Sequence, residues 1–161
     1  MTRRRDETIV LCIGNPLRGD DALGPLAAPR LRGTLGPAAR VIDGNIDGAD
    51  LATICADAGT LVIIDIMVSG MAPGTIARFD ATDAPLPAVL STDSTHLLGV
   101  AQGVELARTL GTLPDRLVVY AVEGSSFEHG APLSDPVSAS LDELVERVVA
   151  EVRAPAARTS R

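Results

Sequence analysis

Short runs of apolar, mostly β-branched residues alternate along the chain with longer segments whose apolar positions recur at helical spacing. Five such runs predict β-strands, at residues 8–14, 40–44, 60–67, 74–80 and 116–124. Between and after them, four segments predict helices, at residues 21–35, 48–58, 96–110 and 135–154. The last helix is expected to begin with Asp135 as its N-cap and Pro136 in its first turn.

This alternation predicts an α/β fold, a three-layer α/β/α sandwich around a mostly parallel sheet of about five strands. The segment "SGMAPG" joins two strands with too few residues for a crossover helix, so one strand is expected to run antiparallel. We expect a single domain over residues 7–154, with flexible tails at 1–6 and 155–161. The proline-rich segment 81–96 is expected to be a long loop, a kind of segment that often carries function.

Composition narrows the possible functions. Apolar residues make up 46% of the 161 residues but aromatic residues only 2%, which predicts a core of Val, Ile, Leu and Ala that includes Cys12 and Cys55. The net charge of −7 argues against a nucleic-acid partner. Apolar runs are shorter than the roughly 20 residues needed to cross a bilayer, so no membrane insertion is expected. The N-terminal arginines are followed by no adequate apolar signal segment, which predicts a cytoplasmic protein.

Polar residues collect where the predicted strands end, which is where parallel α/β sheets bind ligands. Asp20 and Asp21 follow the first strand, Asp43 ends the second, Asp65 ends the third, and His96 opens a helix. Simpler interpretations exist for each of them: Asp20 suits a helix cap, Asp65 an ion pair, and His96 a solvated helix start. A helix N-terminus nevertheless favours a neutral imidazole, the form that binds metals.

The first strand-to-helix turn, "IGNPLRGDDALGP", has two glycines at the spacing of a phosphate-binding loop, Gly14 and Gly19. A phosphate loop would continue with Lys and a hydroxyl residue, where this chain has Asp20 and Asp21. The sequence also lacks GxGxxG and GxSxG motifs. Asp21, Asp65 and His96 together instead make an oxygen and nitrogen donor set for a divalent first-row metal ion.

Four segments occur in a distinctive order along the chain: "IGNPLRGDDALGP", "VIDG", "LVIIDIMVSGMAPGTIARFD" and "STH". With them, the chain resembles the hydrogenase maturation protease family over roughly residues 8–130. The resemblance implies an endopeptidase that removes the C-terminal extension of a nickel–iron hydrogenase large-subunit precursor. It also implies that Asp21, Asp65 and His96 contact nickel already loaded into that precursor. The partner would be the precursor and the nickel would come with it, with no organic cofactor.

For the mechanism, we expect a metal-bound or carboxylate-activated water to attack the peptide carbonyl, with Asp21 or Asp65 as the base. Asp43 is a candidate for a supporting role in orienting ligand or substrate. The free protein is expected to be a monomer. Two other functions stay open at this point: a nucleotide- or phosphate-binding module of similar topology, and a metallochaperone-like protein that binds the nickel-loaded precursor without cutting it.

Overall fold

One five-stranded sheet forms the centre of the molecule in the computed structural model, which describes residues 6–87 and 95–155. The strand order is β2-β1-β3-β5-β4, and every neighbouring pair is parallel except β4 and β5. The predicted mostly parallel sheet with one antiparallel strand is therefore confirmed. The strands are β1 (Thr8–Ile13), β2 (Arg40–Gly44), β3 (Thr60–Met67), β4 (Ile76–Asp80) and β5 (Arg116–Glu123).

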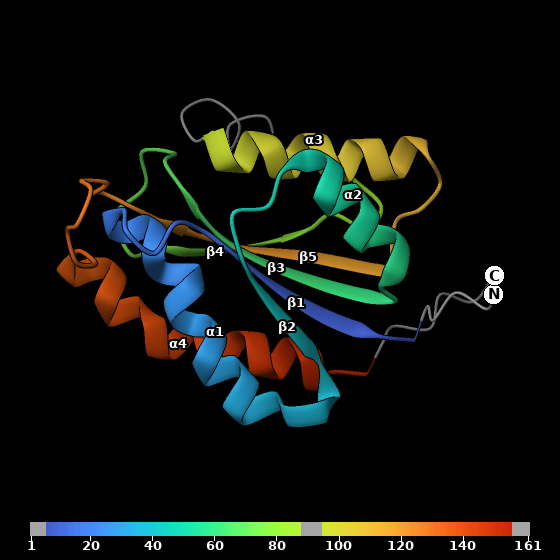
Figure 1. The fold of residues 1–161 in the computed structure, drawn as a ribbon, viewed down its shortest axis with the longest axis horizontal. Coiled ribbons are helices and arrows are strands. Elements are labelled where there is room, and N and C mark those ends of the chain that lie inside the picture. Colours follow the sequence, from blue (N-terminus) through green and yellow to red (C-terminus); the bar gives the residue numbers. More distant parts are fainter. Residues whose placement is uncertain (1–5, 88–94, 156–161) are drawn as a thin grey trace.

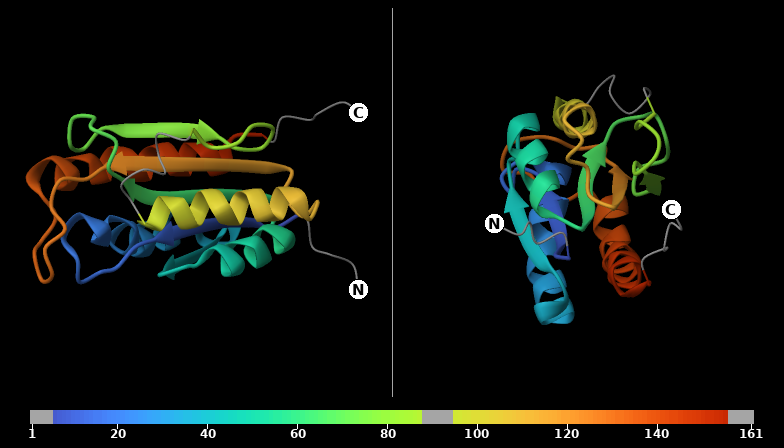
Figure 2. Two further views of the ribbon diagram at one scale, coloured as in Figure 1. Left: turned by 90° about the horizontal axis from the view of Figure 1, so that it is seen from above. Right: turned by 90° about the vertical axis from the view of Figure 1, so that its right-hand side faces the viewer.

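Helices cover both faces of this sheet, which completes the predicted α/β/α sandwich (Figure 1). Helices α1 and α4 pack together on one face, and α2 and α3 pack together on the other, as the two rotated views also show (Figure 2). The helices are α1 (Leu23–Leu35), α2 (Gly48–Asp57), α3 (Thr95–Thr109) and α4 (Asp135–Arg153), with short 3-10 turns at η1 (Gly19–Ala22) and η2 (Gly36–Ala38).

The alternation of side chains along the buried strands supplies a separate core to each helical layer. In β3, Leu61 and Ile63 pack against α2 and α3, whereas Val62 and Ile64 pack against α1 and α4. Both faces are filled by aliphatic side chains, as the near absence of aromatic residues predicts. This alternation also decides which way a polar residue at the end of a strand points.

Two local predictions need correction. The helix expected from residue 21 begins as the 3-10 turn η1, and the α-helix starts at Leu23, so Asp21 belongs to a tight turn. The N-cap of α4 is Ser134 and not Asp135, although Pro136 does occupy the first turn. Ser134 makes no side-chain cap bond, because its hydroxyl donates to Asp20 instead.

The predictions of flexible tails and of a long loop concern residues that the structure describes only in part. The predicted tails, 1–6 and 155–161, overlap the described chain only at Asp6 and Pro155, and part of the predicted loop 81–96 is likewise undescribed. Within 6–87 and 95–155, none of the helices combines the length and the apolar character that crossing a membrane requires.

Candidate active site

Asp21 sits in the 3-10 turn between β1 and α1. Its side chain is almost fully buried, at 2% exposure, even though the turn lies at the end of the sheet. The N–H of Asn15, the second residue after β1, donates to Asp21 Oδ2 at 3.1 Å. The turn therefore folds back on itself and holds the Asp21 carboxylate against the carboxyl end of β1.

Asp65 is the sixth residue of β3 and lies on the same face as Leu61, Ile63 and Met67, the face covered by α2 and α3. It is 1% exposed. The N–H of Ile66 donates to Asp65 Oδ1 at 2.8 Å, while Oδ2 has no hydrogen-bond partner among the described residues. A buried carboxylate oxygen without a donor is costly, and such atoms are concentrated at functional positions.

The two carboxylates are close enough to interact electrostatically. Burial raises the pKa of Asp65 well above its usual range, the Ile66 N–H partly opposes this, and the negative charge of Asp21 raises the pKa further. Burial and like charge both disfavour ionisation of Asp65, and a cation beside the pair would oppose both effects. This electrostatic environment favours a cation.

His96 is the second residue of α3, and its side chain lies outside the described residues. Helix α3 packs on β3, on the sheet face to which Asp65 belongs, and it begins at the end of the molecule where β3 finishes (Figure 1). The backbone thus brings the start of α3 to the same end of the sheet as Asp21 and Asp65. Among the described side chains, no group of three potential ligands forms a metal site.

Asp43 occupies a different environment from Asp21 and Asp65. It lies beside Cys12 in the pairing of β2 with β1, and its carboxylate forms an ion pair with Arg32 in the last turn of α1. That contact turns Asp43 toward the α1 side of the sheet, opposite to the face of Asp65. The supporting role of Asp43 stays a prediction. In the structure, the Asp43 carboxylate is paired with the guanidinium of Arg32.

Asp20 has a role that the sequence did not indicate. Its side chain is fully buried and accepts four hydrogen bonds from the loop between β5 and α4: from the N–H groups of Ser125, Ser126 and Ser134, at 2.7–2.9 Å, and from Ser134 Oγ at 2.9 Å. Burial alone would raise the pKa of Asp20, but these four donors outweigh it and hold the pKa below its usual value. Asp20 anchors a distant loop and caps no helix.

Glu123 performs a similar task for the loop between β3 and β4, a role that its place at the end of a predicted strand did not reveal. It is buried at the end of β5 and accepts hydrogen bonds from the N–H groups of Ser69 and Gly70 and from Ser69 Oγ. A polar residue closing an otherwise apolar strand was the available signal. Through Glu123 and the following serines, the end of β5 fixes the loops on either side of the site.

Side chains that usually act as nucleophiles are poorly placed for this role. Cys12 and Cys55 are buried, and burial raises the pKa of their thiols to about 12 and about 11. Neither thiol is ionised near neutral pH. In the described part of the chain, no serine hydroxyl is hydrogen-bonded to a histidine. The two cysteine thiols are therefore unsuited to act as nucleophiles at this site.

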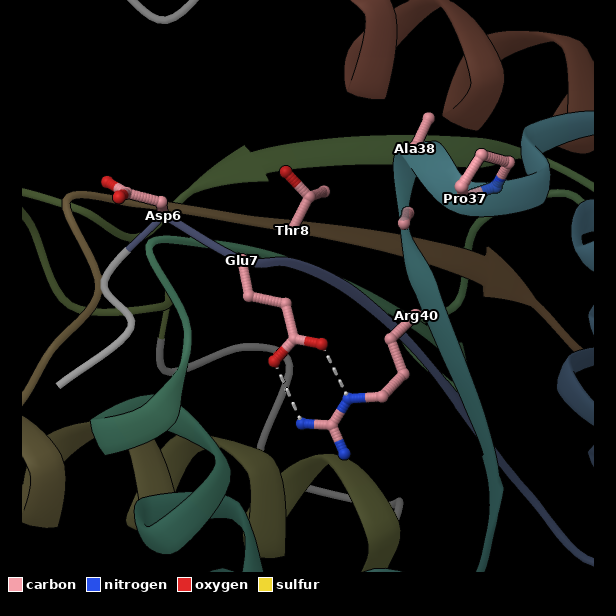
Figure 3. A pocket seen from close by; sticks show the side chains of 7 residues that line it. Asp6, Glu7, Thr8, Pro37, Ala38 and Arg40 are labelled. Atoms are coloured by element: carbon pink, nitrogen blue, oxygen red, sulfur yellow. Dashed lines mark hydrogen bonds and ion pairs between the residues drawn. The ribbon is translucent and has the colours of Figure 1, made fainter.

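A hollow at the opposite end of the sheet offers no comparable chemistry (Figure 3). It lies where β1 begins and where η2 leads into β2. Its charged residues are Asp6, Glu7 and Arg40, of which Glu7 and Arg40 form an ion pair at 3.0 Å. Asp20, Asp21 and Asp65 lie at the other end, where β1 and β3 finish.

The sequence profile of the hydrogenase maturation protease family matches residues 28–151. The chain belongs to this family. The match includes Asp43, Asp65 and His96 and begins after the turn that carries Asp21. The family and its relatives are peptidases, and this member is accordingly a peptidase.

Relatives of this protease support the same assignment along nearly the whole chain. The hydrogenase 2 maturation protease of Escherichia coli is 32% identical over 149 residues, which cover 90% of each protein. The hydrogenase expression/formation protein HupD of Rhodobacter capsulatus is 27% identical over 152 residues, covering 92% of this chain and 72% of HupD. The structure of the E. coli hydrogenase maturating endopeptidase HybD superposes with a TM-score of 0.80, at 30% identity, covering 91% of this chain and 92% of HybD.

Proposed function

We propose that this peptidase removes the C-terminal extension of a nickel-loaded nickel–iron hydrogenase large-subunit precursor. Family membership supports a role in hydrogenase maturation. The observation that carries the finer proposal is the buried pair Asp21 and Asp65, in which Asp65 Oδ2 has no donor among the described residues. Two carboxylates held together out of solvent are suited to a partner that brings positive charge.

In this proposal, the nickel belongs to the substrate. Asp21, Asp65 and His96 would contact it, because carboxylate oxygen and neutral imidazole nitrogen are suitable ligands for a divalent first-row ion. Contact with the metal centre would bring the precursor's C-terminal extension to the carboxylates. Recognition of the loaded state would then precede cleavage.

For the cleavage step, an Asp of this chain would act as the base and a water molecule would be the nucleophile. Asp21 or Asp65 would accept a proton from a water molecule as the water oxygen attacks the scissile carbonyl carbon. The proton would pass to the leaving amine as the peptide C–N bond breaks. Acyl-enzyme formation is not expected, because both cysteines are buried with raised thiol pKa values.

Mass spectrometry of the large subunit tests the proposal directly. Purified nickel-loaded precursor is incubated with the protease, and the mass of the large subunit is followed over time. A protease produces a shortened subunit together with a released C-terminal peptide. The non-cleaving alternative predicts a complex of the two proteins with the precursor mass unchanged, and that outcome would overturn the proposal.

A matched pair of variants separates the site from general effects of charge removal. Asp21→Asn removes one of the two buried carboxylates and should stop cleavage. Asp47→Asn makes the same chemical change at the N-cap of α2, where Asn caps as well as Asp does, and should leave cleavage intact.

The monomeric state of the free protein and its cytoplasmic location stay predictions.

A further inference from the structure

The first turn and the β5–α4 loop form one connected unit although more than 100 residues separate them in the sequence. Besides the four bonds to the Asp20 carboxylate, the Asp20 N–H donates to the Ser126 carbonyl at 2.7 Å, and the Gly130 N–H donates to the Leu17 carbonyl at 2.7 Å. Arg18 pairs with His129 in an antiparallel bridge. The loop thus lies along the whole outer side of the turn.

The first turn and the β5–α4 loop are closely packed at Gly19. Gly19 has a φ of +53°, and a Cβ atom at this position would lie 2.3 Å from the Ser126 carbonyl oxygen. Only glycine adopts this conformation readily and permits such an approach. The residue immediately before Asp20 is therefore pressed against the same loop that Asp20 binds.

From these contacts, and resting on the proposed function, we propose that Asp20 is a positioning residue for Asp21. The two side chains leave adjacent backbone positions of one 3-10 turn. Asp20 fixes that turn to the β5–α4 loop from outside, while Asp21 is held from inside by the Asn15 N–H. Freeing Asp20 would let the turn shift, and Asp21 would move with it.

The donor atoms that bond to the Asp20 carboxylate suggest a set of variants whose effects on the turn should differ in size. Asp20→Asn keeps the size of the side chain but replaces one carboxylate oxygen by an amide NH₂, which cannot accept a hydrogen bond, and removes the negative charge that all four donors contact. Ser134→Ala removes only the Oγ bond. Ser125→Ala is the matched control, because Ser125 donates through its backbone N–H, which alanine retains.

The first readout is steady-state cleavage of the nickel-loaded precursor. A shift of the turn by a fraction of an ångström should lower kcat about 10- to 100-fold in Asp20→Asn, with KM nearly unchanged. Ser134→Ala should show a smaller decrease of kcat in the same direction, and Ser125→Ala should match the wild type. If Asp20→Asn fails to fold, Ser134→Ala carries the comparison, because three of the four bonds remain.

The second readout is independent of catalysis. The Asn15 N–H bonds to Asp21 Oδ2, so its hydrogen exchange reports on the position of Asp21, while the Val10 N–H in buried β1 reports on global unfolding. We expect faster exchange at Asn15 and unchanged exchange at Val10 in the Asp20 and Ser134 variants. Folded variants with wild-type kcat and wild-type exchange at Asn15 would overturn the assignment. If the wild type fails to cleave the precursor, the proposed function fails, and exchange at Asn15 still decides the role of Asp20.

Discussion

Asp20 and Asp21 are adjacent carboxylates with opposite environments. Asp20 is satisfied by four donors from a single loop, and its lowered pKa reflects those bonds. Asp21 faces Asp65, whose pKa is raised by burial and by the charge of Asp21. One carboxylate of this turn thus anchors a loop, and its neighbour lies within electrostatic reach of Asp65.

Replacing either of two proposed metal-contacting residues should abolish processing. Asp21→Asn removes the charge needed to hold a cation while preserving shape, and His96→Ala removes the imidazole nitrogen. We expect cleavage of nickel-loaded precursor to fall at least about 100-fold in each case, because charge and general-base contributions of this size are lost. Time-resolved mass spectra of the large subunit measure the effect.

Folding provides the control for these two variants. Asp21 lies in a 3-10 turn and His96 is the second residue of α3, so we expect the thermal midpoint to change little in both variants. Circular dichroism melting curves check this expectation. Folded variants that process the precursor at the wild-type rate would exclude Asp21 and His96 from the site.

At the scale of elements, the sequence was informative because strands and helices are specified locally. Buried aliphatic runs and helical periodicity predicted every strand and α-helix of the described chain to within two residues, but not the two 3-10 turns. Asp65 could be singled out because a carboxylate after four apolar residues demands an explanation. The anchoring bonds of Asp20 could not be foreseen, because their donors lie 105 to 114 positions away and all three residues donate through the backbone N–H.

The position of Glu151 also could not be predicted from the local sequence pattern. A charged residue in an amphipathic helix is expected to face solvent. In the structure it is buried between α4 and the sheet, where it bonds to Arg78 and to Tyr120 Oη and pairs with Arg116. These partners come from β4 and β5. Glu151 thus links the antiparallel edge of the sheet to the C-terminal helix.

This cluster makes stability sensitive to acid. Hydrogen bonds from Arg78 hold the pKa of Glu151 down to about 2 against the effect of burial, with further lowering by Tyr120 and Arg116. Because the folded pKa is below the unfolded one, the stabilisation is present above about pH 4.5 and is lost as the pH falls toward 2. Urea unfolding at a series of pH values should show this decline in the free energy of unfolding.

Variants of the cluster assign the acid effect to Glu151. Glu151→Gln should lower the free energy of unfolding at pH 7 by about 2 kcal/mol, since it leaves two arginines without their buried partner. Its stability should also fall less steeply below pH 4.5 than that of the wild type. Tyr120→Phe removes one hydrogen bond, should cost about 1 kcal/mol, and should keep the acid dependence. An unchanged acid dependence in Glu151→Gln would show that other carboxyl groups cause it.

At the scale of the whole molecule, the open end of the parallel sheet is where this fold class binds ligands, and its acidic character restricts what can bind. Asp20 and Asp21 occupy the turn that would cradle a phosphate, and the net charge of the chain is −7. Mononucleotides and dinucleotides should therefore show no useful affinity. Titration calorimetry checks this expectation, and micromolar binding at the first turn would favour the phosphate-binding alternative.

The same acidic end explains why the metal state of the substrate should control cleavage. Two carboxylates within electrostatic reach of each other attract a cation, repel an anion and have no net Coulomb attraction for an uncharged partner. A precursor that carries nickel supplies that cation at its own active site. A precursor without nickel presents the same polypeptide without the charge that would anchor it.

The most direct test of the account compares wild-type protease on nickel-loaded and nickel-free precursor, prepared from the same polypeptide and followed by mass spectrometry of the large subunit. We predict that the nickel-loaded subunit loses its C-terminal extension and that the nickel-free subunit keeps its full mass. Adding Asp21→Asn to the comparison should leave both subunits uncut. Equal processing of the two precursors by the wild type would contradict metal-gated recognition and would leave the sequence of the extension as the only determinant.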